Sequence, residues 1–123
     1  MPTAKRGRIE PKSKVWIEVD GKYLMGDGRA MLLEEIDRHG SISGAARRLE
    51  MSYRHAWGYI RKIEERFGMK VVETKRGGRD GGQARLTRQG RRFLHTYHRF
   101  REAVSTAIGE QFRQHFGARR KVS

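Results

Sequence analysis

The stretch GSISGAARRLEMSYRHAWGYIRKIEERFG, residues 40–68, carries two apolar patterns, each with a serine in front of it. The shorter pattern contains the small residues Ala45 and Ala46, and a hydroxyl from Ser41-Ile42-Ser43 can cap its helix. Ser52 can cap the longer one, in which apolar residues recur at helical spacing. These residues are Tyr53, Ala56, Trp57, Ile60, Ile63 and Phe67. A short capped helix, a tight turn and a longer helix together predict a helix-turn-helix.

A hairpin and one helix are expected before this unit. Residues 15–19 and 22–25 have the composition of strands and flank Asp20-Gly21, a favoured two-residue turn. Apolar residues at helical spacing then predict a helix over residues 29–39, which a glycine ends.

A second hairpin and a long helix are expected after it. Val71-Val72-Glu73 and Ala84-Arg85-Leu86 are predicted strands on either side of a glycine-rich basic loop. A hairpin in this place, directly after a helix-turn-helix, is called a wing. Thr87 can cap the last helix, whose apolar stripe extends over about five turns, longer than one small domain can cover. Its members are Phe93, Tyr97, Phe100, Val104, Ile108 and Phe112. The fold class predicted is mainly α with small β hairpins, a winged helix-turn-helix with a long C-terminal dimerisation helix.

The composition favours a nucleic acid as partner. The 123 residues include 28 Lys and Arg against 14 Asp and Glu, a formal net charge of +14. The excess is regional: residues 23–52 carry four basic and five acidic side chains, whereas residues 75–101 carry nine basic side chains and one acidic. We expect one domain over residues 15–112, with a basic flexible arm at 1–14 and a basic tail at 113–123.

Several other classes of protein do not fit. The chain has no cysteine, which excludes disulfides and thiolate metal sites, and it has neither a membrane-length apolar run nor a signal peptide. We therefore expect a cytoplasmic, nucleoid-associated protein with no membrane contact. Gln83-Ala84 stands where a P-loop needs Lys and Ser or Thr, and Met31 stands at the third glycine of a dinucleotide fingerprint. His95 and His98 form a weak metal pair, and the acidic run Glu34, Glu35 and Asp37 is typical of a polar helix face. No enzyme, metal or cofactor is predicted.

The outward face of the helix that begins after Ser52 is the predicted reading surface. A step of 100° per residue leaves five side chains and a glycine on the side away from the apolar stripe: Arg54, His55, Gly58, Arg61, Lys62 and Glu65. The N-terminal half of the helix has no acidic residue, so it can enter the major groove, where Arg donates hydrogen bonds to guanine. An ordinary amphipathic helix with a merely hydrated face is the alternative, and the preceding short helix argues against it.

The sequence resembles a known family, the DNA-binding domain of the molybdate-responsive, ModE-type transcription regulators. This domain is itself similar to the N-terminal domain of LysR-type regulators. The resemblance spans residues 15–112. The matching runs are Gly40-Ser41-Ile42-Ser43 with Ala45-Ala46, Met51-Ser52-Tyr53-Arg54 with Ala56-Trp57, Gly77-Gly78 with Gly81-Gly82, and Ala84-Arg85-Leu86-Thr87 with Gly90.

The resemblance implies a winged-helix homodimer that binds a two-fold site on double-stranded DNA. The family's oxyanion pocket lies in further C-terminal domains, and because the sequence ends at Ser123 we expect no molybdate pocket in this chain. The expected DNA contacts are Ser43, Ser52, Tyr53, Arg54, His55, Gly58, Arg61, Lys62, Lys75, Arg76 and Arg79. The expected dimer contacts are Tyr97, Phe100, Val104, Ile108 and Phe112. An architectural or RNA-binding basic protein without base readout is the alternative function.

Overall fold

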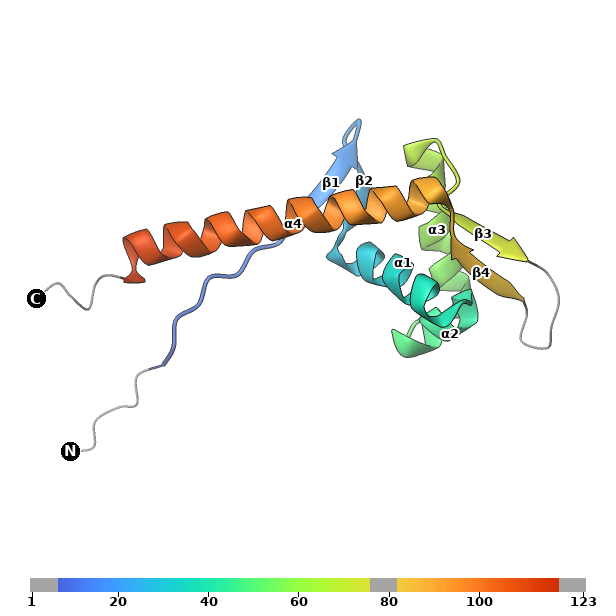
Figure 1. The fold of residues 1–123 in the computed structure, drawn as a ribbon, viewed down its shortest axis with the longest axis horizontal. Helices are drawn as coiled ribbons and strands as arrows, with labels where there is room; N and C mark the ends of the chain where they lie inside the picture. The colour runs from blue at the N-terminus through green and yellow to red at the C-terminus, as the bar shows by residue number, and fades with distance from the viewer. Residues whose placement is uncertain (1–6, 76–81, 118–123) are drawn as a thin grey trace, which may run out of the picture.

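A computed structural model describes residues 7–75 and 82–117 of the chain. In these residues the chain forms four helices and two antiparallel hairpins, and one helix projects well beyond the rest (Figure 1). The elements in chain order are β1 (Trp16–Val19), β2 (Lys22–Gly26), α1 (Asp27–His39), α2 (Ile42–Arg48), α3 (Tyr53–Phe67), β3 (Val72–Lys75), β4 (Gln83–Leu86) and α4 (Arg88–His115). The predicted fold class, a mainly helical winged helix-turn-helix, is confirmed. Within the described residues, no helix is both long and apolar enough to cross a membrane.

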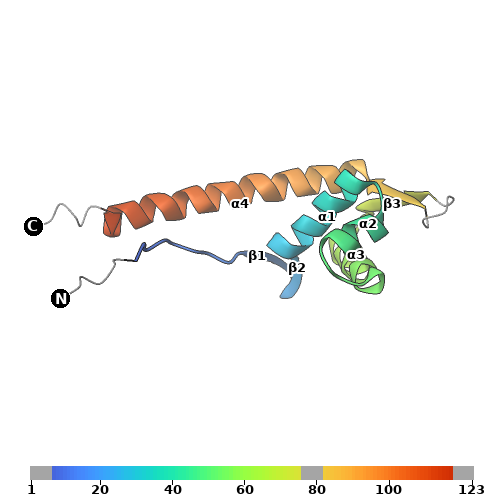
Figure 2. The ribbon, with the colours of Figure 1, turned by 90° about the horizontal axis from the view of Figure 1, so that it is seen from below.

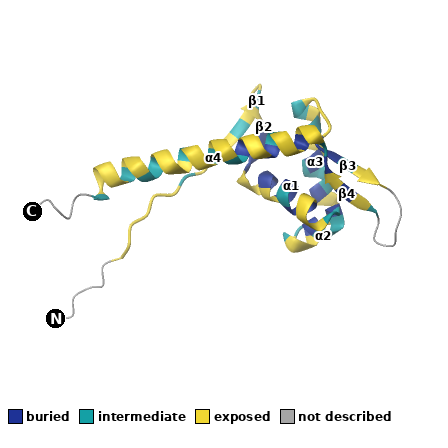
Figure 3. Cartoon of the chain, viewed as in Figure 1, coloured by how far each residue is buried: buried dark blue, intermediate teal, exposed yellow. Residues whose placement is uncertain are grey.

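The core lies where α1, α2, α3 and the two hairpins meet (Figure 3). Three apolar side chains of α1, Leu32, Leu33 and Ile36, are completely buried, and the face of α3 that packs inwards is equally inaccessible. In Figure 2, α4 and α3 lie on opposite sides of α1. Because α1 is covered from both sides, it is the element against which the others are placed.

The local signals in the sequence account for the element ends. Asp20 and Gly21 both have positive φ, 51° and 79°, as a type I′ hairpin turn requires. The hydroxyls of Ser52 and Thr87 accept hydrogen bonds from the first turns of α3 and α4, as predicted. The prediction that α1 begins at residue 29 was wrong: α1 begins at Asp27, whose carboxylate in the first turn suits the positive end of the helix dipole.

The junction between the wing and α4 depends on one close backbone contact. A Cβ added to Gly90 would lie 2.2 Å from the carbonyl oxygen of Val71, so only glycine lets α4 approach the start of β3. The Thr87 hydroxyl donates to the carbonyl of Lys70 over 2.7 Å, and Glu64 accepts from the backbone N–H of Val71 over 2.8 Å. Together these contacts fix where the wing leaves the domain.

Ion pairs join α1 to α4 along their common side. Asp37 lies 3.2 Å from Arg91, and Glu34 lies 3.2 Å from Nε2 of His98. Glu34 and Asp37 form the expected polar face, whereas Glu35 is buried and lies 3.0 Å from Arg38. Exposed pairs of this kind each contribute about 0 to 1 kcal/mol, so they orient α4 more than they stabilise it.

The first turns of α4 pack on the domain and the later turns extend past it. At 1.5 Å per residue its 28 residues are about 42 Å long. Tyr97, expected at a dimer contact, is only 2% exposed in its own core, because its hydroxyl reaches α1. That assignment is corrected: Tyr97 is not accessible to a partner. Phe100 is 45% exposed, and Val104, Ile108 and Phe112 are partly exposed.

Asp27 is the point where α1, α4 and the N-terminal segment are held together. The Tyr97 hydroxyl donates to its Oδ1 over 2.6 Å, and Nε of Arg101 lies 3.1 Å from the same oxygen. Arg101 also donates to the carbonyl of Ser13 over 3.0 Å. The hydrogen bond from Tyr97 and the charge of Arg101 lower the pKa of Asp27, although burial opposes this. Burial and the Asp27 carboxylate raise the pKa of Tyr97.

Replacing Asp27 by Asn should lower the free energy of unfolding by about 1 kcal/mol near neutral pH, because Tyr97 and Arg101 lose a charged acceptor. The folded-state pKa of Asp27 is depressed, so this stabilisation is present above the ordinary value of 3.8 and is lost as pH falls through the lowered pKa. Denaturant titrations at neutral and acidic pH should show the gap between wild type and Asp27→Asn closing in acid. Glu110→Gln, which removes an exposed carboxylate of α4 outside this cluster, is the control. A gap independent of pH would contradict the account.

Candidate nucleic-acid interface

The rotation of α3 about its own axis is fixed by the residues it buries. Ala56, Ile60 and Ile63 are completely inaccessible, as the apolar pattern predicted. Tyr53 was placed in the same stripe, but it is 51% exposed, because it lies in the first turn beyond the reach of the core. Its ring instead contacts Trp57 edge-on, with the ring centroids 6.4 Å apart.

The structure leaves the predicted reading face of α3 open to solvent. Arg54 and His55 in the first turn and Arg61 and Lys62 further along are all exposed. Gly58 lies between these pairs, and a Cβ built there would meet no atom within 4 Å. The first turn contains no acidic residue. This face therefore presents hydrogen-bond donors around a shallow point at its centre.

The side chain of His55 packs on that of Tyr59, which itself packs on Arg29. Its imidazole stacks on the ring of Tyr59, with centroids 5.0 Å apart. The guanidinium of Arg29 lies 5.2 Å from the centroid of the Tyr59 ring and donates to the carbonyl of Leu24 over 2.9 Å. Arg29 is 8% exposed, and this burial lowers its pKa. The first hairpin thus supports α3 through Arg29, a connection that the sequence pattern did not indicate.

A hollow of about 170 Å³ lies where α2, the start of α3 and the base of the wing meet. Ser43, Tyr53 and Lys75 line it, which brings together three of the predicted contacts from three elements. Thr74 and Gln83 line it too. The sequence analysis missed these two, and the strand register at the base of the wing was the signal that could have found them.

Ser43 and Lys75 are the predicted contacts in α2 and β3. Of the two serines that could cap α2, Ser41 is the N-cap, and its hydroxyl accepts from the N–H of Gly44 over 2.9 Å. Ser43 therefore lies inside the first turn. Lys75 is exposed at the end of β3, whereas Arg76 and Arg79 lie outside the described residues. Within those residues no group of three or more metal-ligating side chains comes together.

A family model described as "Bacterial regulatory helix-turn-helix protein, lysR family" matches residues 29–91, which are 63 of the 123 residues. The chain belongs to this family. The match includes α1, α2, α3, both strands of the wing and the start of α4. The predicted resemblance to LysR-type regulators is confirmed, and with it the prediction of a DNA-binding transcription regulator at the level of the family.

The curated relatives of this LysR-type chain include proteins whose names refer to molybdenum. It is 39% identical over 89 residues to the molybdenum-pterin-binding protein MopA of Rhodobacter capsulatus, covering 72% of this chain and 34% of that protein. It is 35% identical over 81 residues to the DNA-binding transcriptional dual regulator ModE of Escherichia coli K12, covering 66% and 31%. The chain spans about a third of the length of the curated relatives it matches.

Solved structures support the fold. The LysR-type chain matches the crystal structure of the CbnR DNA-binding domain in complex with DNA, with a TM-score of 0.55 at 22% identity, over 71% of this chain and 93% of that one. It also matches ArgP from Mycobacterium tuberculosis, with a TM-score of 0.51 at 22% identity, over 68% and 29%. At this identity the likeness concerns the arrangement of helices and wing.

Replacing Gly58 by Ala should stabilise the protein, since glycine inside a helix costs about 0.5 to 1 kcal/mol relative to alanine and the added Cβ meets nothing. If the open face of α3 approaches base edges closely, the same methyl should weaken duplex binding. For this one variant, we therefore expect the unfolding temperature to rise and the affinity for duplex DNA to fall. Higher stability with unchanged affinity would show that no partner approaches at Gly58.

Proposed function

We propose that this LysR-type chain binds a two-fold site on double-stranded DNA as a homodimer, with α3 reading bases in the major groove and the wing contacting phosphates. The observation that carries the proposal is the exposed first half of α3, which is free of acidic residues and held in one orientation by buried side chains. The proposed DNA contacts are those expected from the sequence: Ser43, Ser52, Tyr53, Arg54, His55, Gly58, Arg61, Lys62, Lys75, Arg76 and Arg79.

Base reading needs donors with fixed directions, and α3 offers them. Arg54 and His55 extend from the first turn of a helix whose next residue, Ala56, is completely buried. Phosphate contacts need charge more than precise geometry. The wing supports that second role, because its strands end in exposed Lys75 and the connecting segment carries Arg76 and Arg79. DNA is also the partner of the CbnR domain in its crystal structure, and that domain shares this fold.

Dimerisation through α4 is supported by the apolar side chains that remain outside the core. Phe100, Val104, Ile108 and Phe112 follow one another at intervals of four residues, so each lies beside the next along the projecting helix. None of them belongs to the buried core of the domain. Burying one Val or Ile side chain contributes about 1.5 to 3 kcal/mol, so several together can hold a dimer despite the basic charge.

Arg54→Ala should cost about 1 to 3 kcal/mol in binding to the preferred site and much less on scrambled DNA, because it removes a base-edge contact. Lys75→Ala should weaken all duplexes alike and reduce the salt slope by about one. Titrations against a panel of single-base changes separate the two patterns. If Arg54→Ala and His55→Ala both leave the preference profile unchanged, α3 is not the reader, and a basic protein without base readout becomes the better description.

Val104→Glu combined with Ile108→Glu should convert the protein to a monomer, because two carboxylates would face their counterparts across the proposed helix pair. Sedimentation at micromolar concentration measures this directly. Glu102→Gln, on an exposed position of the same helix, should leave the assembly unchanged. A wild-type protein that sediments as a monomer would contradict the homodimer, while leaving binding to one half of the site open to measurement.

A further inference from the structure

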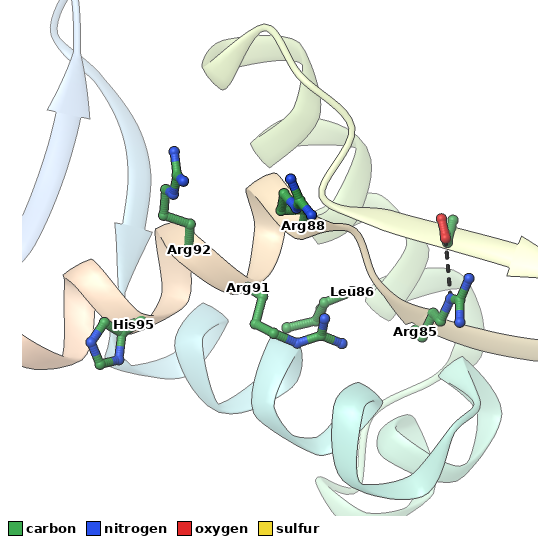
Figure 4. Close-up of a pocket in the computed structure, with 7 residues that line it drawn as sticks. Arg85, Leu86, Arg88, Arg91, Arg92 and His95 are labelled. Carbon is green, nitrogen blue, oxygen red and sulfur yellow. Dashed lines mark hydrogen bonds and ion pairs between the residues drawn. The ribbon is translucent and has the colours of Figure 1, made fainter.

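A second basic surface lies at the start of α4 (Figure 4). It is an open hollow of about 660 Å³ lined by Glu73 and Arg85 from the wing and by four side chains from the first two turns of α4: Arg88, Arg91, Arg92 and His95. Leu86 is the one apolar residue in its lining, and it is only 1% exposed. None of these residues belongs to the proposed reading face of α3.

Two of the four arginines in this hollow have no carboxylate partner in the part of the chain that the structure describes, and the other two stay exposed. Arg85 lies 3.1 Å from Glu73 and Arg91 lies 3.2 Å from Asp37, and both arginines remain more than half exposed. Among the described residues, Arg88 and Arg92 have no ion-pair partner.

The position of these arginines is unfavourable for the helix itself. Arg88, Arg91 and Arg92 stand in the first five residues of α4, the positive end of its dipole, and no acidic residue lies in the first turn. Arg88 and Arg92 are also like charges four residues apart on one face. Such an arrangement is favourable only when an anion is bound, which indicates a binding surface rather than a stabilising one.

The shape of the surface fits an extended anion. Figure 4 shows Arg88 and Arg92 extending from one side of α4, while Arg91 extends from the other, where it pairs with Asp37 of α1, so the guanidinium groups do not converge on one point. A small oxyanion could therefore contact only some of these guanidinium groups at once. Protein partners rely on exposed apolar or aromatic anchors, which this lining lacks, whereas a phosphodiester backbone needs only cations.

This hollow and the one beside α3 lie on opposite faces of the wing, because successive residues of a strand face opposite sides: Glu73 and Arg85 line the first hollow, whereas their neighbours Thr74 and Ala84 line the second. A duplex held by the N-terminal half of α3 and by Lys75 would therefore face the other side of the wing. We propose that the hollow formed by Arg85, Arg88, Arg91, Arg92 and His95 binds the backbone of a second DNA duplex, so that one dimer can bring two DNA segments together. The inference rests on the proposed function, because α3 must hold the first duplex.

The test is a capture experiment with two duplexes. A two-fold duplex selected from a random library is immobilised and saturated with the protein, and capture of a short labelled duplex of scrambled sequence is then measured. Arg88→Gln combined with Arg92→Gln should reduce capture about tenfold and leave affinity for the first duplex within about threefold. Because the removed charges oppose the helix dipole, this variant should unfold at a temperature no lower than wild type.

The matched control is Lys22→Gln combined with Arg99→Gln, which removes the same charge from two exposed positions outside the hollow. Capture should survive in this control. Equal loss in both double variants would reduce the effect to net charge and overturn the proposal. Two results would instead assign the hollow to the DNA molecule that α3 already holds. One is a loss of affinity for the first duplex in the Arg88→Gln, Arg92→Gln variant. The other is that a longer immobilised duplex binds more tightly to the wild type but not to this variant. Tighter binding of labelled polyglutamate than of duplex would assign it to an acidic protein.

The experiments distinguish a failure of this inference from a failure of the proposed function. If wild-type protein saturates the immobilised duplex and captures no second one, the inference is wrong and the proposed function stands. If selection yields no preferred duplex and binding depends on charge alone, the proposed function fails and the inference fails with it.

Discussion

The complete burial of Ala56, Ile60 and Ile63 decides which side of α3 faces solvent, and most other features of the molecule serve that packing. Methyl and branched side chains at these positions leave one rotation of the helix that buries them all. A helix rotated by half a turn would put Arg54 and Arg61 into the core, where unpaired charges cost several kcal/mol. The exposed donor face is therefore a consequence of core packing, and it exists before any partner arrives.

Charge is distributed so that a strongly basic chain can still hold its long helix against the domain. The carboxylates of α1 lie opposite basic side chains of α4, with Asp27 against Arg101 and Asp37 against Arg91. This pairing engages carboxylates of α1 and leaves the exposed face of α3 and the start of α4 basic. The electrostatic field that remains is thus concentrated on two sides of a small domain, which suits a protein that meets polyanions.

Much of this fold was predictable because its signals are local. Glycines, serines and a threonine at element ends, and apolar residues at periods of 2 and 3.6, depend only on near neighbours in the chain, and the hairpin turn at Asp20-Gly21 and the cap at Ser52 are as predicted. Apart from small shifts at the starts of helices, what failed concerned contacts between distant residues. Periodicity placed Tyr97 on a dimer stripe, but its hydroxyl bonds Asp27, 70 residues away, and this buries the ring in its own domain. The outward face of α3 followed from its helical period, whereas the support of His55 by Tyr59 and Arg29 depends on tertiary packing that no sequence period encodes.

The central claim is that a pre-formed helix face reads DNA sequence with two-fold symmetry. Selection of bound duplexes from a random library, followed by sequencing of the recovered pool, tests it most directly. The account predicts a recovered motif made of two inverted half-sites at one fixed spacing. A recovered pool with no sequence preference beyond base composition would contradict it.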